Sequence, residues 1–215
     1  MQITWHGYAC FTIKGKKATL VTDPYHPDVL ALPKPKLSAD IVTISHDHAG
    51  HNNSAGVAGE PKVFDWPGEY EALEVVVEGI PTFHNPRDAE SLGANTVFSI
   101  IIDGLRLCHL GDLGHKLTSE QASEIGGVDV LFIPVGGHVT IDAKKAREVV
   151  EQISPSLVVP MHYQQDGLKA DLDELSLFLK EMGSEVIERV DMLKINSKRD
   201  LVEADGKIVV LNPQV

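Results

Sequence analysis

The sequence predicts an α/β fold, in which a four-layer αββα sandwich places helices outside two sheets. Three observations predict it: apolar runs of strand length recur along the chain, short turns join some of them, and amphipathic helical stripes separate others. The chain has 215 residues, of which 43% are hydrophobic, so it can bury a sizeable core. Because no low-complexity tract or long linker divides it, we expect a single domain over residues 1–215.

Short turns predict three hairpins between apolar segments of strand length. The paired segments are Cys10–Ile13 with Ala18–Val21, Phe98–Ile102 with Leu105–Leu110, and Leu201-Val202 with Ile208–Val210. Asp103-Gly104 and Asp205-Gly206 form the second and third turns, and such pairs suit the positive φ angles of a type I′ turn.

Four continuous apolar runs rich in β-branched residues predict further strands, covered on both faces. They are Ile41–Ile44, Val75–Val77, Val130–Ile133 and Leu157–Val159.

Helical patterns follow in the second half of the chain. Thr118 begins a capping box and Gly126-Gly127 ends that helix, while Asp142 caps a second helix that Ser154-Pro155 ends. The second helix and a third one, closed by Gly183, each show an apolar stripe at helical spacing. These stripes are Ala143, Ala146, Val149, Val150 and Ile153, and then Leu172, Leu175, Phe178, Leu179 and Met182.

Composition excludes several classes of protein. The formal net charge of −12 argues against a nucleic-acid partner, because phosphate would be repelled. No apolar run approaches the ~18–20 residues of a membrane span, and the N-terminus lacks the basic start and apolar core of a secretion signal. The two cysteines, Cys10 and Cys108, lie in apolar segments, so we expect buried thiols and a cytoplasmic protein.

Histidines provide the sharpest functional signal. His46, His48 and His51 follow directly after the predicted strand Ile41–Ile44. Side chains at alternate positions of an extended loop point the same way, so His46 and His48 can bind one ion from the same side. The alternative is a polar surface loop in which the histidines cap turns.

Other candidate ligands recur at matching places. His84, Asp112 and His162 each follow an apolar stretch, at the point where a strand is expected to end. Each one alone is more typical of an ordinary loop or turn residue. Together with the His46 loop they predict a metal centre along one edge of a sheet.

Six stretches in this order carry a resemblance to a known family. They are Thr4–Phe11, Val21–Pro24, Ser45–His51, His109–His115, Pro134–Gly137 and Pro160–Tyr163. The sequence resembles the metallo-β-lactamase superfamily, whose signature is His-x-His-x-Asp-His followed by a distant His, an Asp and a final His. It is most similar to the small bacterial zinc-dependent hydrolases that include ascorbate-6-phosphate lactonase-like proteins. The resemblance implies the metallo-β-lactamase fold.

The same resemblance implies a centre for one or two metal ions. The implied ligands are His46, His48 and His84 for the first metal, His51 and His162 for the second, and Asp112 between the two. Asp23, at a predicted strand end, is expected to orient a ligand imidazole. Nitrogen and oxygen ligands suit Zn²⁺, with Fe or Mn as alternatives.

Two positions depart from the family pattern. Gly50 stands where the signature has Asp, so one ligand of the second metal is missing and we expect that site to be weakened. Asp47 is no simple replacement, because it lies between His46 and His48 and points to the opposite side. Tyr8 stands where relatives often carry His, and it either borders the pocket or packs as a half-buried tyrosine.

These observations indicate a metal-dependent hydrolase, in which a metal-activated hydroxide attacks a small ester, lactone or phosphodiester. The substrate is expected to be an anionic small molecule. Asp112 would bridge the metals or orient the water, and His115 or His138 would give the leaving group its proton.

Two other hypotheses stay open. The glycine at position 50 could have impaired catalysis, leaving a metal-binding relative that binds a ligand or partner. The second open hypothesis is a nuclease. The acidic composition and the lack of an added RNA-binding domain argue against it.

Overall fold

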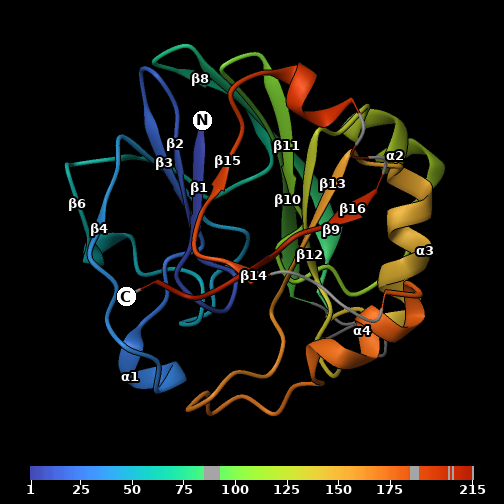
Figure 1. The fold of residues 1–215 in the computed structure, drawn as a ribbon. Helices are drawn as coiled ribbons and strands as arrows, with labels where there is room; N and C mark the ends of the chain where they lie inside the picture. Colours follow the sequence, from blue (N-terminus) through green and yellow to red (C-terminus); the bar gives the residue numbers. More distant parts are fainter. Residues whose placement is uncertain (85–92, 185–188, 203, 205, 215) are drawn as a thin grey trace.

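A computed structural model describes residues 1–84, 93–184, 189–202, 204 and 206–214. Two sheets face each other in this part of the chain (Figure 1). The first has six strands in the order β15-β1-β2-β3-β5-β7, and the second has seven in the order β16-β13-β12-β11-β10-β9-β8. The predicted α/β sandwich is therefore confirmed.

The first sheet contains strands from both ends of the chain. Its members are β1 (Gln2–Trp5), β2 (Phe11–Lys14), β3 (Thr19–Thr22), β5 (Ile41–Thr43), β7 (Lys62–Phe64) and β15 (Leu193–Lys194). β15 returns to pair antiparallel with β1, so the edge of this sheet joins segments about 190 residues apart.

The second sheet is mixed. Its strands are β8 (Gly68–Ala72), β9 (Val75–Phe83), β10 (Ala94–Ile102), β11 (Leu105–His109), β12 (Val130–Pro134), β13 (Leu157–Met161) and β16 (Lys207–Ile208). β10 runs antiparallel to both β9 and β11, while β11, β12 and β13 are parallel. The carboxyl ends of β9, β11, β12 and β13 therefore meet at one edge of the sheet.

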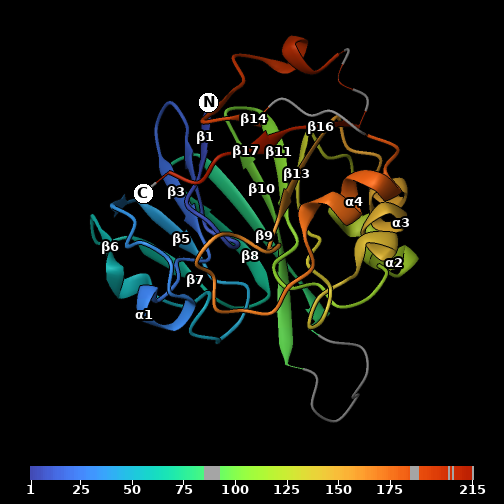
Figure 2. The same cartoon turned by 60° about the horizontal axis from the view of Figure 1, so that its bottom comes forward.

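Helices cover the outer face of the second sheet. They are α2 (Ser119–Ile125), α3 (Ala143–Ile153) and α4 (Leu175–Glu181), and Figure 2 shows them together on one side of the molecule. On the opposite side, the first sheet carries the short pair β4 (Leu37–Ser38) and β6 (Val57–Ala58), with α1 (Pro27–Leu30) near its lower end. A second short pair, β14 (Arg189–Val190) and β17 (Val210–Leu211), completes the described strands. No described helix has the length and apolarity needed to cross a membrane.

Local signals predicted several elements correctly. The β2–β3 and β10–β11 hairpins form as expected, and Asp103 and Gly104 adopt φ angles of 54° and 78°. The capping box of α2 and the Asp142 cap of α3 are also present. All five apolar stripe residues of α3 are buried, and both cysteines are buried and free.

Two expectations about strands were wrong. The third hairpin does not form: Leu201 ends a short 3₁₀ helix, and β16 pairs in parallel with β13. Its turn residue Asp205 lies outside the described residues. The run Val75–Val77 is not covered on both faces, because Val76 is 42% exposed near the edge of the sheet.

The core lies between the two sheets. Phe11 of β2 contacts Phe132 of β12 with ring centres 4.5 Å apart, so the two layers meet through aromatic side chains. Trp5, Phe98 and Tyr25 are also almost fully buried. Burial of each such side chain stabilises the fold by roughly 1.5–3 kcal/mol, which makes this core a firm support for the loops at the strand ends.

Candidate metal centre

Four loops at strand ends supply the candidate ligands. The loop after β5 holds His46, His48 and His51, and backbone hydrogen bonds from His51 N–H and Asn52 N–H to the His48 carbonyl turn it back on itself. The other three ligands follow β9, β11 and β13. The sheet topology thus brings together residues that are more than 100 positions apart in sequence.

The first group comprises His46, His48 and His84, which we call the first trio. One ring nitrogen from each lies within 4.8 Å of the others. Their ring centres are 4.5 to 5.2 Å apart. His46 and His84 are buried and His48 is exposed, so this trio faces solvent on one side.

The second group is built around the Asp112 carboxylate and includes His51 and His162; we call these three residues the second trio. Asp112 Oδ2 is 3.2 Å from the Nε2 atoms of both His51 and His162. The same oxygen is 3.0 Å from His84 Nε2 and 3.7 Å from His46 Nε2. Asp112 Oδ2 therefore lies close to imidazoles of both trios.

Buried polar atoms of this cluster show that its residues fit a metal ion. Among the described residues, His46 Nε2, His51 Nε2, His162 Nε2 and Asp112 Oδ1 have no hydrogen-bond partner. One carboxylate oxygen cannot satisfy four imidazoles, and each buried unsatisfied polar group costs about 1–3 kcal/mol. A cation that accepts several of these lone pairs would remove that cost, and nitrogen and carboxylate donors suit Zn²⁺.

Charges in the cluster also favour cation binding. Burial raises the pKa of Asp112, but the neighbouring His162 and His51 outweigh it and hold that pKa well below the usual range. Burial, with a smaller contribution from His51, lowers the pKa of His46 to about 3, so this imidazole is neutral at pH 7. Burial also lowers the pKa of His51, yet Asp112 and Asp23 reverse the effect and raise it to about 10. Binding through His51 must therefore displace a proton.

Asp23 orients one of these imidazoles. Its Oδ2 accepts hydrogen bonds from His51 Nδ1 at 2.9 Å and from Ser45 Oγ at 2.6 Å, and its Oδ1 accepts from Ser45 N–H at 2.8 Å. Ser45 Oγ lies 2.9 Å from His46 Nδ1 and can accept its proton. With Nδ1 as the donor in both rings, Nε2 is the atom of His46 and of His51 that faces the Asp112 cluster, and in His51 it can bind a metal once its proton is displaced.

The two departures from the family pattern lie side by side. The Tyr8 ring is buried against His162 and His51, with ring centres 4.1 and 5.1 Å apart. Burial, with Asp112 and Asp23 nearby, raises the pKa of Tyr8, so its phenol is neutral at pH 7. A Cβ atom on Gly50 would meet this ring. Asp47 is exposed and accepts a hydrogen bond from Asn52, away from the cluster.

His115 and His138 lie outside both trios. His115 Nδ1 donates to the Lys116 carbonyl at 2.7 Å, and its Nε2 accepts from Phe83 N–H at 3.2 Å. It thereby holds the end of β9, next to His84. His138 is partly exposed, and its ring nitrogens are 4.0 Å from Asp171 and 3.7 Å from Asp173. That either residue donates a proton to the leaving group stays a prediction.

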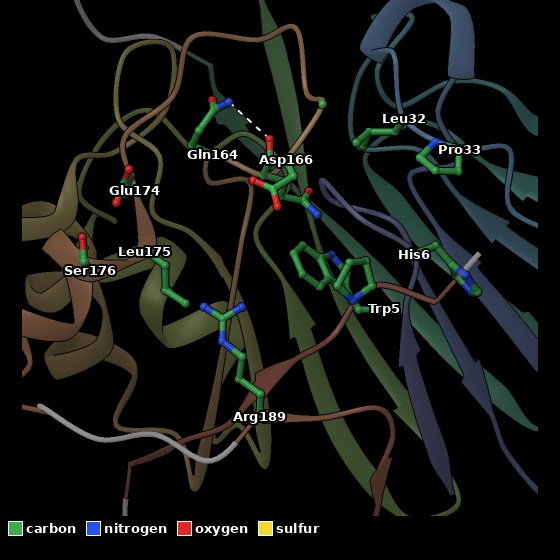
Figure 3. Close-up of a pocket in the computed structure, with 13 residues that line it drawn as sticks. Trp5, His6, Leu32, Pro33, Gln164, Asp166, Glu174, Leu175, Ser176 and Arg189 are labelled. Atoms are coloured by element: carbon green, nitrogen blue, oxygen red, sulfur yellow. Dashed lines mark hydrogen bonds between the residues drawn. The ribbon is translucent and has the colours of Figure 1, made fainter.

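Two contacts of the site have no signal in the local sequence. Ser45 joins Asp23 to His46, and Gln165 accepts a hydrogen bond from Tyr8 N–H at 2.8 Å. Gln165 also lines a cavity of about 730 Å³. Trp5 and Arg189 line the same cavity and are labelled in Figure 3. Residues of the two trios are not among its described lining, so the cavity lies beside the metal cluster rather than on it.

Comparison with known proteins places the chain in a family. Residues 2–162 match the family model described as beta-lactamase superfamily domain. A metal-dependent hydrolase of Thermoplasma acidophilum is 31% identical over 87% of this chain and 94% of its own, and one of Pyrococcus abyssi is 28% identical over 87% and 96%.

Solved structures agree with the sequence match. The crystal structure of a Thermotoga maritima protein, described as a zinc-dependent hydrolase of the metallo-beta-lactamase superfamily, superposes with a TM-score of 0.81. It is 39% identical, and the match covers 98% of this chain and 97% of that one. The chain therefore belongs to the beta-lactamase superfamily domain family and has the metallo-β-lactamase fold.

Proposed function

We propose that the chain is a metal-dependent hydrolase of a small, anionic ester, lactone or phosphodiester. One observation carries the proposal: imidazoles from three separate loops converge on the buried Asp112 carboxylate, and the Nε2 atoms of His51 and His162 have no hydrogen-bond partner among the described residues. Relatives that span nearly the whole chain are described as metal-dependent hydrolases, which supports the same reaction class.

The first trio would hold one ion and the second trio another, with Asp112 shared between them. When bound, such an ion supplies Lewis acidity, which lowers the pKa of water toward ~7 and polarises a carbonyl or phosphoryl oxygen. Asp112 contributes a negative charge that aligns the imidazoles around it. Asp23 fixes the ring of His51 through a short hydrogen bond.

Substrate charge follows from the same arrangement. The protein carries a formal net charge of −12, so its general surface repels anions. The exposed side of His48 is where a cation would reverse that field locally. A small anion could be held there by charge, whereas a long polyanion such as RNA would also meet the acidic surface around it.

Metal analysis followed by hydrolysis assays tests the proposal. The purified protein would be analysed for Zn, Fe and Mn by mass spectrometry, and then assayed on p-nitrophenyl esters, a lactone and bis-p-nitrophenyl phosphate. We expect stoichiometric metal and turnover of at least one class. A sample that holds no transition metal, and takes up none stoichiometrically, would refute the assignment.

A metal-binding relative with impaired catalysis is the second candidate, and the absence of a side chain at Gly50 favours it. The two candidates differ in turnover rather than in metal content. Full metal occupancy without hydrolysis of any of the three substrate classes would support this second candidate.

A further inference from the structure

We infer that Tyr8 and Gly50 are a matched pair: the Tyr8 ring fills the space that a carboxylate at position 50 would need, so the centre binds one ion firmly and a second one weakly. The inference rests on the proposed function, because it concerns the affinity of the same two trios for metal. It explains the two departures from the family pattern as one change.

Space, rather than backbone conformation, is what requires glycine at position 50. Gly50 is not among the residues with positive φ, so its backbone is open to any L-amino acid. A Cβ atom there would lie 3.0 Å from Tyr8 Cε1, and 3.7 Å from both Tyr8 Cδ1 and Leu30 Cδ2. The first distance is shorter than ordinary van der Waals contact, so even alanine would press on the ring. An aspartate adds three heavy atoms beyond this Cβ, so it needs more room than alanine does.

Tyr8 has little freedom to move aside. Its N–H donates to Gln165 Oε1 at 2.8 Å, and its carbonyl accepts from His162 N–H at 3.0 Å and from Trp5 Nε1 at 3.1 Å. Tyr8 as a whole is 7% exposed, and its ring packs against His51 and His162. Bonded on both sides of its Cα, the residue keeps its ring beside position 50.

The ring affects one trio more than the other. Among the described residues, Tyr8 makes ring contacts with His51 and His162 of the second trio and with no imidazole of the first. A neutral phenol in place of a carboxylate removes one negative charge and one ligand beside these two histidines. The second trio therefore offers three protein groups, with Asp112 as its one anion.

Zinc stoichiometry tests this consequence. Wild type, Gly50→Asp, Tyr8→His and the double variant would be dialysed against buffered free Zn²⁺, and the bound zinc counted by mass spectrometry. We expect wild type to bind one ion at least ~10-fold more tightly than a second. The double variant should bring the two affinities together, while Gly50→Asp alone should not. Two ions bound equally tightly by wild type, or by Gly50→Asp alone, would overturn the inference.

A double-mutant cycle of melting temperatures tests the contact between Tyr8 and position 50 in the absence of metal. In chelator-treated protein, Gly50→Ala should lower Tm by roughly 2–4 °C in the Tyr8 background. The same change made together with Tyr8→His should cost less or nothing. Gly127→Ala is the matched control, because its backbone is not in the positive-φ region and a Cβ there meets nothing within 4 Å.

The possible failures are distinguishable. If Gly50→Ala is as neutral as Gly127→Ala, or costs the same with and without Tyr8→His, the inference is wrong. If wild type binds two ions with equal affinity, the inference about Tyr8 and Gly50 is wrong, but the proposed function is unaffected. No zinc bound by any of the four proteins overturns the inference, and the proposed function falls with it only if iron and manganese are not bound either.

Discussion

Replacement of Asp23 by asparagine should weaken metal binding although Asp23 belongs to neither trio. The carboxylate is fully buried and accepts three hydrogen bonds, from Ser45 N–H, Ser45 Oγ and His51 Nδ1. An asparagine oxygen can still accept from Ser45 N–H, but its NH₂ group would face the other two donors. Two of the three bonds are therefore lost or reversed.

The magnitude follows from the bond that reaches a ligand. A hydrogen bond to a charged group contributes about 1.5–3 kcal/mol, and only the one to His51 acts on metal binding directly. Its loss corresponds to roughly 10–100-fold in metal affinity, which is the range typical of such supporting residues. We expect the loss in the ion bound by the second trio, because the first trio contains no direct partner of Asp23.

Competition with a chromophoric chelator would measure the affinities of both ions in wild type and in Asp23→Asn. Asp47→Asn is the matched control, because this exposed carboxylate lies in the same loop but bonds only Asn52 among the described residues. Affinities of Asp23→Asn that match those of the control would refute the idea that Asp23 orients His51.

Three further outcomes are expected. His84→Ala should lose bound metal, activity and Tm, whereas His26→Ala should change none of them, and equal metal content in the two variants would show the ligand assignment to be wrong. Gly136→Ala should destabilise the fold by about 1–3 kcal/mol in urea, because its Cβ would lie 2.2 Å from the His162 carbonyl oxygen; unchanged stability would contradict this contact. His6→Gln should flatten the loss of stability between pH 7 and 5. Burial lowers the pKa of His6 in the folded protein below 6.5, despite a hydrogen bond to the Gln214 carbonyl. In acid the unfolded chain therefore binds more protons than the folded one, and the free energy of unfolding decreases as the pH is lowered. Parallel pH profiles for wild type and variant would count against that explanation.

Elements encoded by neighbouring residues could be predicted from the sequence. Asp103-Gly104 specifies its own turn, and Thr118 with Gln121 specifies the start of α2, because all atoms involved lie within a few residues. The pairing of β15 with β1 could not be predicted in the same way. Neither segment carries a local signal that names its partner, and the choice depends on the whole sheet.

The same distinction between local and long-range determinants applies to the candidate site. The spacing of His46 and His48, and the strand-end positions of His84 and Asp112, were enough to predict which residues would meet. Which of these side chains contacts which could not be predicted, because the contacts depend on how three loops fold back at the ends of their strands. The sequence marked Tyr8 and Gly50 as separate departures; that they touch depends on chain segments about 40 residues apart.

Three residues at the site have strained backbone conformations. Tyr8, Asp23 and His162 have φ angles of 55°, 38° and 51°, a region that glycine occupies without strain. Each such residue costs of order 1–3 kcal/mol, which is a large share of the ~5–15 kcal/mol that stabilises a typical protein. Glycine at any of the three positions would relieve the strain but remove a specific contact. Tyr8 would lose the ring that covers His51 and His162, Asp23 the hydrogen bond to His51, and His162 the imidazole beside Asp112. An ion that binds only the folded chain would offset this cost by mass action. Positive φ angles also occur at Ala31 and Ser154, which lie outside the cluster, so strain alone does not mark the metal centre. What distinguishes these three residues is that each side chain contacts a histidine or the carboxylate of the second trio, and glycine would lose that contact.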